Sequence, residues 1–248
     1  MPAIDLSQVR PVSKADVKGR RVIVRADLNV PVKDGKVTDA TRLERLVPGL
    51  KNLAARGARV VVISHFGRPK GGPDKENSLR PVAGMLERLL GSPIAWGSDC
   101  IGPESDKTVG TLKDGGIAVL ENLRFHKGEE KNDPAFAAAL AELGDVYVSD
   151  AFSVAHRAHA STEGLAHKLP AYAGRSMQAE LEALERALGN PVKPVAAVVG
   201  GAKVSTKLDV LKHLVARVDH LIIGGGMANT FLAARGVDVG KSLCEHDL

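Results

Sequence analysis

Four apolar stretches in the first two-thirds of the chain each run into a polar segment that carries Arg or His. Continuous runs rich in β-branched residues are typical of strands buried on both faces, as in a parallel sheet. Ligands bind outside the carboxyl ends of such strands, which meet at one edge of the sheet. The four stretches are VIVRADLNV (22–30), VVVISHFGR (60–68), IAVLENLRFH (117–126) and VYVSDAFSVAHRAH (146–159).

Helical patterns alternate with these strands, as expected of βαβ units in an α/β fold. A turn at 33–36, in which Gly35 can take a positive φ, precedes a helix that opens at 38–41 and runs to about residue 56. Pro48 lies inside that helix and predicts a kink or a break. Further helices are expected at 78–90, 133–143 and 176–188.

The helix at 176–188 is expected to connect two lobes, because the strand–helix rhythm restarts after it at 195–207 and 220–231. The second lobe looks incomplete. Only two strand–helix units and a trace of a third fit into 192–248, and a sheet of about two strands would leave one edge and one face open to water.

Composition narrows the class of ligand. The 248 residues are 44% apolar and 25% charged, which is ordinary for a globular protein, and no apolar run approaches the length of a membrane span. The formal net charge of +5 would suit nucleic acid, an acidic membrane surface or an anionic substrate. Aromatic residues make up only 3%, which disfavours stacking on bases, so no nucleic-acid or membrane partner is expected. Two cysteines with no metal-binding spacing indicate a reduced, cytoplasmic setting.

The polar segments after the strands predict one rim that is dense in cations and hydrogen-bond donors. Several arginines on one rim repel each other unless an anion lies between them, and the arginine fork binds carboxylate or phosphate with two hydrogen bonds. A small, multiply charged anion fits this rim. Its expected members are Asp27, Asn29, His65, Arg68, Arg124, His126, His156, Arg157 and His159.

Each of these residues also has a structural interpretation. Asp27 and Asn29 can cap their own turn, or they can bind hydroxyls or a carboxylate of a polar substrate. A single histidine near a strand end often serves only packing, and a single arginine such as Arg124 or Arg157 often pairs with a nearby carboxylate such as Glu121 or Asp150. Arg42 lies in the first turns of a helix, where the helix dipole disfavours a positive charge. This position is weak evidence that Arg42 has a functional role.

Two glycine-rich segments follow later strands. Residues 200–207 (GGAKVSTK) predict a strand, a turn and a helix whose N–H groups can face a phosphate, with Lys203 and Lys207 on one helical face. Gly224, Gly225 and Gly226 would allow a flat ligand to approach closely. No P-loop, no GxGxxG after the first strand, no metal-binding spacing and no GxSxG motif is present, so no NAD site and no metal ligand is assigned.

Seven motifs occur together and in order, and their series resembles the phosphoglycerate kinase family over nearly all of residues 22–248. They are VIVRADLNVP, SHFGRPKG, ENLRFHKGEE, DAFSVAHRAHAS, PAYAGRSM, VVGGAKVSTK and LIIGGGMANTF. The resemblance implies two doubly wound, Rossmann-like α/β lobes joined by a hinge helix. We expect a phosphoglycerate-binding lobe at 1–172, the hinge at 173–192 and a partial nucleotide-binding lobe at 193–248.

The resemblance also implies an activity in glycolysis: transfer of a phosphoryl group between 1,3-bisphosphoglycerate and ADP, which gives 3-phosphoglycerate and MgATP. It further implies that the enzyme is a monomer. It assigns Asp27 and Asn29 to the hydroxyl and carboxylate side of the phosphoglycerate, and Arg42 and Lys207 to the transferring phosphoryl group. Arg42 is also expected to bind the substrate, and the further substrate residues are His65, Arg68, Arg124 and Arg157. The nucleotide residues are Gly201, Lys203, Lys207, Gly224, Gly225 and Gly226.

The chain departs from the family in length, because a ribose-binding Glu and a GGGD segment whose Asp holds Mg²⁺ are missing. Phe66 and residues 153–154 differ mildly from the side chains that are common at these positions in the family. We therefore expect a truncated kinase sequence that is weakly active or inactive as it stands, with the protein ligand of Mg²⁺ beyond residue 248. A non-catalytic module that binds a phosphorylated three-carbon acid is the alternative.

Overall fold

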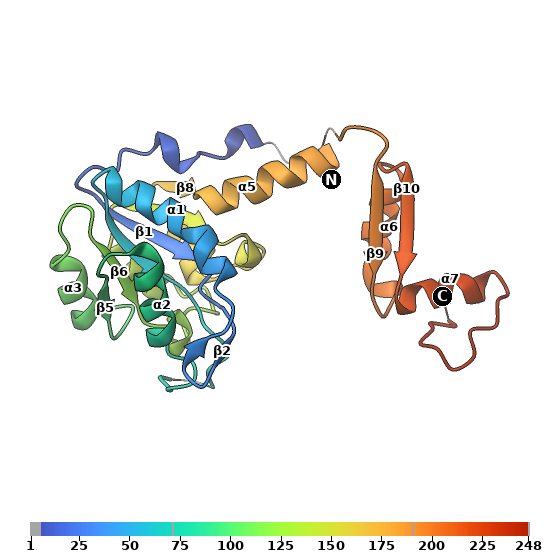
Figure 1. Ribbon diagram of the computed structural model, residues 1–248, viewed down its shortest axis with the longest axis horizontal. Helices are drawn as coiled ribbons and strands as arrows, with labels where there is room; N and C mark the ends of the chain where they lie inside the picture. The colour runs from blue at the N-terminus through green and yellow to red at the C-terminus, as the bar shows by residue number, and fades with distance from the viewer. Residues whose placement is uncertain (1–5, 71, 190, 248) are drawn as a thin grey trace. The chain divides into compact units, whose positions relative to one another are not determined.

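The computed structural model describes residues 6–70, 72–189 and 191–247 (Figure 1). Contacts within the chain divide them into two compact units, with the division between Leu181 and Glu182. The division falls inside helix α5 (Arg175–Leu184), the segment predicted to connect two lobes. A π-helical turn, η6 (Glu185–Gly189), follows α5 directly.

The first unit is built on a six-stranded sheet in the order β5-β6-β4-β1-β7-β8. Every neighbouring pair is parallel, and Val24 at the centre of the sheet pairs with Val62 on one side and Val148 on the other. The predicted parallel sheet is therefore confirmed. Its strands are β1 (Arg21–Ala26), β4 (Arg59–Ile63), β5 (Ala95–Gly97), β6 (Ile117–Leu120), β7 (Val146–Asp150) and β8 (Ala171–Ala173).

Helices cover both faces of this sheet, because alternate side chains of each strand point to opposite faces. Val22 and Val24 of β1 pack in one apolar cluster with helices α1 (Thr41–Ala55) and α2 (Arg80–Leu90). Ile23, between them, packs in a second cluster with α3 (Pro103–Gly110) and α4 (Pro134–Ala141). The doubly wound α/β fold is confirmed by this arrangement.

Local signals at the ends of the helices agree with the structure. The carboxylate of Asp133 accepts hydrogen bonds from the backbone N–H of Ala135 and Phe136, which caps α4. Helix α2 ends at Gly91, whose φ is +70°. Pro48 is exposed, and α1 continues through it, so of the predicted kink or break the break is absent.

Short elements complete the first unit. The predicted turn at 33–36 joins the hairpin strands β2 (Val32–Lys33) and β3 (Lys36–Val37), with φ of +51° at Asp34 and +70° at Gly35. The remaining elements are the 3₁₀ turns η1 (Leu6–Gln8), η2 (Val12–Lys14), η3 (Leu123–Phe125) and η4 (Phe152–Val154), and the π-helical turn η5 (Ala160–Gly164).

The second unit contains one parallel strand pair, β9 (Ala196–Gly200) and β10 (His220–Gly224). Helices α6 (Leu208–Val215) and α7 (Gly226–Ala234) and the turn η7 (Ser205–Lys207) accompany the pair.

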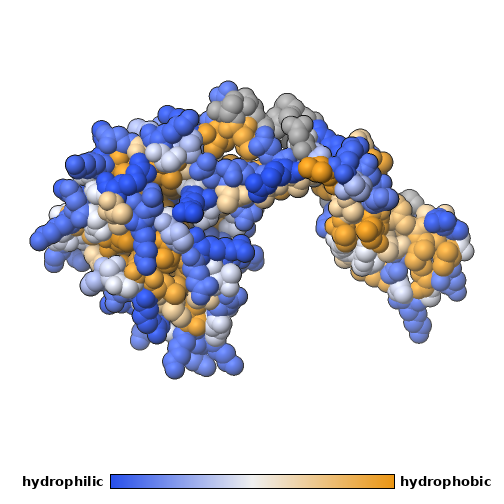
Figure 2. All heavy atoms as spheres, turned by 45° about the horizontal axis from the view of Figure 1, so that its top comes forward, coloured by the Kyte–Doolittle hydropathy of each residue, from blue (hydrophilic) through white to orange (hydrophobic). Residues whose placement is uncertain are grey.

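The apolar core of this unit is small, and its fully buried members are Val204, Leu211 and Met227. Val198 is 74% exposed and Ile222 is 53% exposed, and such side chains give the unit the apolar surface visible in Figure 2. A two-strand sheet with an open face is the arrangement that the sequence predicted. Within the described ranges, no helix combines the length and the apolar character needed to cross a bilayer.

Candidate functional site

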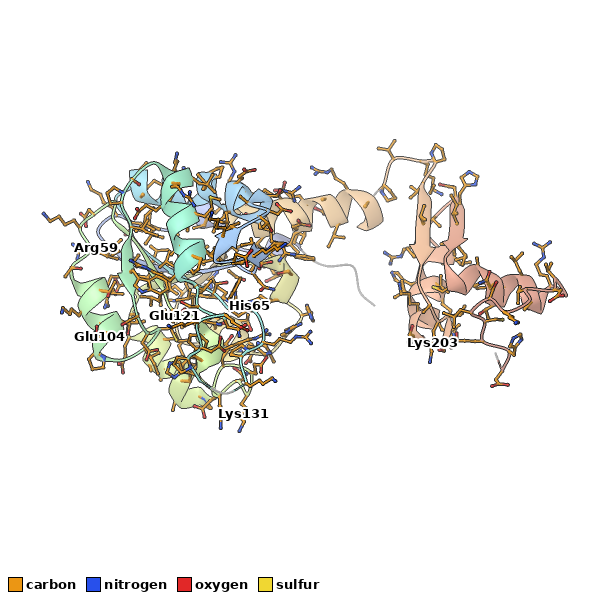
Figure 3. The ribbon with its side chains drawn as sticks, turned by 60° about the horizontal axis from the view of Figure 1, so that its bottom comes forward. Arg59, His65, Glu104, Glu121, Lys131 and Lys203 are labelled. Atoms are coloured by element: carbon orange, nitrogen blue, oxygen red, sulfur yellow. The ribbon has the colours of Figure 1, made fainter. Side chains whose placement is uncertain are left out.

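Four loops of the first unit leave the carboxyl ends of four neighbouring strands, in the order β6, β4, β1 and β7. Strands β4 and β1 lead to helices on one face of the sheet, whereas β6 leads to α4 on the other face. The direction of the connections therefore changes between β4 and β6, and ligands of doubly wound proteins bind outside the strand ends at such a point. His65 and Glu121, labelled in Figure 3, lie in these two loops.

Hydrogen bonds between the loops hold this edge in place. The hydroxyl of Ser64 accepts from the N–H of Leu28 at 3.0 Å, and the Oδ1 of Asn29 accepts from the N–H of Gly67 at 3.0 Å. Asn29 therefore links the loop after β1 to the loop after β4, and its side-chain oxygen is engaged with backbone.

Asn122, which the sequence did not single out, links the loops after β4 and β6. Its side chain is buried; its Oδ1 accepts from the N–H of Phe66 at 3.0 Å, and its Nδ2 donates to the carbonyl of Phe66 at 2.7 Å. Arg124 adds a bond from its NH1 to the carbonyl of Gly67 at 2.8 Å. The backbone around His65 and Arg68 is thus fixed from both sides.

Asp27 serves as both a turn residue and an ion-pair partner. Its Oδ1 accepts from the N–H of Asn29 at 3.1 Å, so the turn interpretation holds. Its Oδ2 accepts from the Arg42 NH1 at 2.7 Å and from the Ser153 hydroxyl at 2.7 Å. Arg42 is the second residue of α1, as predicted, and its side chain is 54% exposed. Ser153 was not assigned a role from the sequence.

His65 is held uncharged by its surroundings. The side chain is buried, and the Arg25 NH2 lies 3.0 Å from its Nδ1. Burial, followed by the positive charges of Arg25, Arg124 and Arg157, lowers the pKa of His65 from 6.5 to about 3. A neutral imidazole can donate one hydrogen bond without adding charge to the rim.

The arginines of the rim have few carboxylate partners. The Arg124 side chain is only 7% exposed; burial lowers its pKa, as do the charges of Arg157 and Arg68. Its Nε lies 3.1 Å from the Glu130 Oε1 but makes no hydrogen bond there. Among the described residues, neither Arg68 nor Arg157 forms an ion pair with a carboxylate. An anion would relieve this repulsion.

Two histidines expected at the rim have other partners. The His126 Nε2 lies 2.6 Å from the Asp99 Oδ1, and the ring stacks on Phe136 at 5.2 Å between centroids. This places His126 beside the segment after β5, where Asp99 already engages its Nε2. The His156 Nε2 accepts from the Nε of Arg157 at 3.3 Å.

Asp99, His126 and the buried Cys100 bring their ligand atoms within 4.8 Å of one another. Burial raises the pKa of the Cys100 thiol, and Asp99 and His126 already bind each other. The trio is therefore a hydrogen-bonded pair beside a neutral thiol.

A cavity of about 250 Å³ adjoins the Asp27–Arg42 pair and is also lined by Asp150, Ser153 and Ser176. Asp150 is buried at the end of β7, and its Oδ1 accepts from the N–H of Met177 at 2.9 Å near the start of α5. Burial raises the pKa of Asp150. This carboxylate thus ties the sheet edge to α5, and it does not pair with an arginine of the rim.

The glycine-rich segments lie in the second unit. Gly225 has φ +65° and precedes α7, and the N–H of Met227 donates to the carbonyl of Gly201 at 3.0 Å, so the two segments lie side by side. A Cβ on Gly225 would lie 3.1 Å from the Gly201 carbonyl oxygen, so a larger residue would be crowded there. Lys203 is exposed in the loop after β9 (Figure 3).

The two lysines do not share a helical face, and that prediction is wrong. Residues 201–204 form a loop, Ser205–Lys207 form a 3₁₀ turn, and α6 begins only at Leu208. The Nζ of Lys207 turns back and donates to the carbonyl of Gly200 at 2.7 Å. Extra loop residues after the glycine pair delay the helix, and periodicity alone does not reveal this delay.

Fold and rim together define a doubly wound α/β protein with arginine and histidine side chains gathered at the carboxyl edge of its parallel sheet, followed along the chain by a strand–glycine–helix unit. The family model described as phosphoglycerate kinase matches residues 12–248, and the chain belongs to the phosphoglycerate kinase family.

Individual relatives agree. A phosphoglycerate kinase of Rhizorhabdus wittichii is 69% identical over 94% of this chain and 59% of that protein, and one of Sinorhizobium medicae is 65% identical over 94% and 58%. The structure of phosphoglycerate kinase from Coxiella burnetii is 45% identical with a TM-score of 0.86, over 96% of this chain and 60% of that one. The chain therefore spans about 60% of the length of the relatives it matches.

Proposed function

We propose that this protein transfers a phosphoryl group between 1,3-bisphosphoglycerate and ADP, giving 3-phosphoglycerate and ATP in glycolysis. We further propose that it acts in the cytoplasm as a monomer, with no nucleic-acid or membrane partner. The observation that supports the proposal most strongly is the group of rim arginines, short of carboxylate partners, around a neutral histidine. A phosphorylated three-carbon acid has the two anionic ends that such a group would neutralise.

The proposed substrate contacts divide the rim between the two ends of the ligand. Arg68, Arg124 and Arg157 would bind carboxylate or phosphate oxygens, because two or three of them must be neutralised at once. His65 would donate one neutral hydrogen bond to an anionic oxygen. Asp27 and Asn29 would bind the hydroxyl and carboxylate side, for which Asp27 has to exchange part of its present bonding.

Arg42 and Lys207 are the proposed catalytic residues. Phosphoryl transfer needs in-line positioning and cancellation of charge more than covalent help from the protein. Arg42 is exposed and held by Asp27, so it is available to the transferring group. Lys207 would offer its ammonium group after leaving the carbonyl of Gly200.

The nucleotide would bind to the glycine-rich segments of the second unit. Gly224 has open space where a Cβ would lie, whereas Gly201, Gly225 and Gly226 let the backbone segments pack closely against each other, and Lys203 adds an exposed positive charge. Mg²⁺ accompanies the nucleotide in this reaction and neutralises phosphate oxygens when bound. We assign none of the described residues to the metal.

The domain organisation is part of the proposal. We infer a phosphoglycerate-binding lobe at 1–172, a hinge at 173–192 and a partial nucleotide-binding lobe at 193–248. Arg42 belongs to the first of these lobes and Lys207 to the last.

Two measurements test the proposal. Calorimetry with 3-phosphoglycerate should give saturable heat that sulfate reduces by competition, and absence of both would contradict the substrate assignment. An assay that couples ATP formation to a dye should then detect transfer from 1,3-bisphosphoglycerate, at a low rate in this chain. Binding with no transfer at all would favour a non-catalytic phosphoglycerate-binding module.

A further inference from the structure

A chain of buried polar groups runs behind the rim to His65, and the sequence did not indicate it. Its acidic end is Glu129, which is fully buried and accepts from the Ser161 hydroxyl at 2.6 Å and from the Ser161 N–H at 2.9 Å. The Ser161 hydroxyl oxygen in turn accepts from the Nε of Arg25 at 3.0 Å. The Arg25 NH2 then reaches the His65 Nδ1 at 3.0 Å.

Arg25 is an unusual residue for its position. It lies in the central strand β1 and is only 1% exposed. A buried guanidinium is costly unless it is paired and hydrogen-bonded. Its NH1 bonds to the carbonyl of Ala26, its Nε bonds to Ser161, and the charge of Glu129 opposes the lowering of its pKa by burial. These contacts hold the Arg25 guanidinium in one orientation, in which its NH2 is left to donate to His65.

The chemistry of the contact fixes the proton on His65. Arginine has five N–H donors and no acceptor, and it stays protonated in proteins. Since NH2 can only donate, the Nδ1 at 3.0 Å must accept, and it therefore carries no proton. A neutral imidazole carries its single proton on the other nitrogen, which here is Nε2.

We propose that Arg25 is a positioning residue that holds His65 in the Nε2–H tautomer, and that Glu129 acts through Ser161 to hold Arg25. Nε2 then offers one directed, uncharged donor to the rim. This role rests on the proposed function only in naming the recipient, an oxygen of the phosphoglycerate. The tautomer itself is a property of the free protein.

The surroundings explain why a neutral donor is useful there. The groups that act on His65 are Arg25 from β1, Arg124 from η3, and Arg157 and His159 after η4, while Glu129 lies 3.7 Å from the Nδ1 of His159. Four of these five groups are cationic or can become so. A charged imidazolium would add to their repulsion before the ligand arrives, whereas a neutral N–H adds a hydrogen bond without that cost.

The direct test is nuclear magnetic resonance on the unmodified chain with ¹⁵N-labelled histidine, in which two-bond couplings distinguish the two tautomers from imidazolium. The His65 signal is identified by its loss in His65→Gln. We expect the Nε2–H pattern, unchanged between pH 8 and pH 5. An Nδ1–H pattern, a mixture or a titration near pH 6.5 would overturn the proposal.

A variant tests the role of Arg25 itself. Arg25→Met with Glu129→Gln removes both buried charges together and keeps similar volumes. We expect the His65 spectrum to lose its single Nε2–H pattern and the affinity for 3-phosphoglycerate to fall about tenfold or more. Arg21→Met with Asp145→Asn is the control, because it removes a charge pair at the opposite end of the same strand. An unchanged His65 spectrum in the first double variant would refute control by Arg25.

The two proposals fail separately. If the Nε2–H pattern is present but 3-phosphoglycerate gives no heat, then the substrate assignment fails and the inference about Arg25 stands. If 3-phosphoglycerate binds but His65 shows another protonation pattern, then the inference fails and the substrate assignment stands.

Discussion

The NH1 of Arg42 lies 2.7 Å from the Oδ2 of Asp27, so two residues proposed to act on the substrate are bound to each other in the free protein. This pair keeps a long, exposed arginine in place and satisfies a carboxylate that Ser153 also contacts. A ligand that binds Asp27 would compete with Arg42 and release it. Binding at the rim and the freeing of a catalytic cation are therefore coupled in this account.

Arg42→Met should separate catalysis from binding. We expect phosphoryl transfer to fall by about 10²–10³, because one preorganised electrostatic contact to the transferring group is lost. The affinity for 3-phosphoglycerate should change by less than about tenfold, since Arg42 is engaged with Asp27 in the free protein. Coupled assays and calorimetry measure the two effects, with Arg88→Met on α2 as the control. A large loss of affinity with unchanged turnover would contradict the assignment.

Arg124→Met should weaken substrate binding. Arg124 is nearly buried and braces Gly67, so its loss removes a charged hydrogen bond and loosens the loop that carries Arg68. We expect a loss of about 1.5–3 kcal/mol in the binding free energy of 3-phosphoglycerate, measured by calorimetry. Glu130→Gln removes the competing carboxylate and should leave the affinity equal or higher. Equal affinity of Arg124→Met and the parent would remove Arg124 from the site.

Asp150→Ala should destabilise the first unit. The variant loses the acceptor for the N–H of Met177 and the partner of the Ser176 hydroxyl. We expect the free energy of unfolding to fall by about 1–2 kcal/mol, as for loss of a helix cap. Asp150→Asn keeps an acceptor oxygen and should cost less. Urea denaturation followed by circular dichroism distinguishes the two, and equal losses would argue against the capping role.

Stability should depend on pH through His65. The pKa of His65 is about 3 in the folded chain, whereas its ordinary value is 6.5. Below pH 6.5 the unfolded chain therefore binds a proton at His65 that the folded chain does not bind. The free energy of unfolding therefore falls as the pH falls, by at most about 1.4 kcal/mol per pH unit from this group. His65→Gln should reduce the loss between pH 7 and pH 5 by about 2 kcal/mol. Exposed Arg88→Met, which removes no group that titrates in this range, should not, and equal slopes for all three proteins would contradict the burial argument.

Much of the fold could be predicted from the sequence because its central strands are long apolar runs. Strands β1, β4, β6 and β7 follow from those runs. The edge strands β5 and β8 have three residues each, too few to give a pattern, and pairing with a neighbour defines them. Helix α3 was also missed, because its Pro103–Gly110 segment holds only one large apolar residue that is buried, Val109.

The candidate site was predictable in its residue types but not in its pairings. Motifs after the strands indicated His65, Arg68, Arg124 and Arg157, whereas the side-chain partners depend on strand register and loop path. His126 turns to Asp99 for that reason. Arg25 was overlooked because it stands inside an apolar run; a charged residue at a central strand position is the signal that could have identified it.

The most direct test of the central claim is calorimetric titration of this chain with 3-phosphoglycerate, compared with the Arg68→Met/Arg157→Met double variant at low and high ionic strength. We expect saturable binding that weakens as salt is added and that is lost in the double variant. Absence of binding to the parent chain, or binding that survives removal of both arginines, would contradict it.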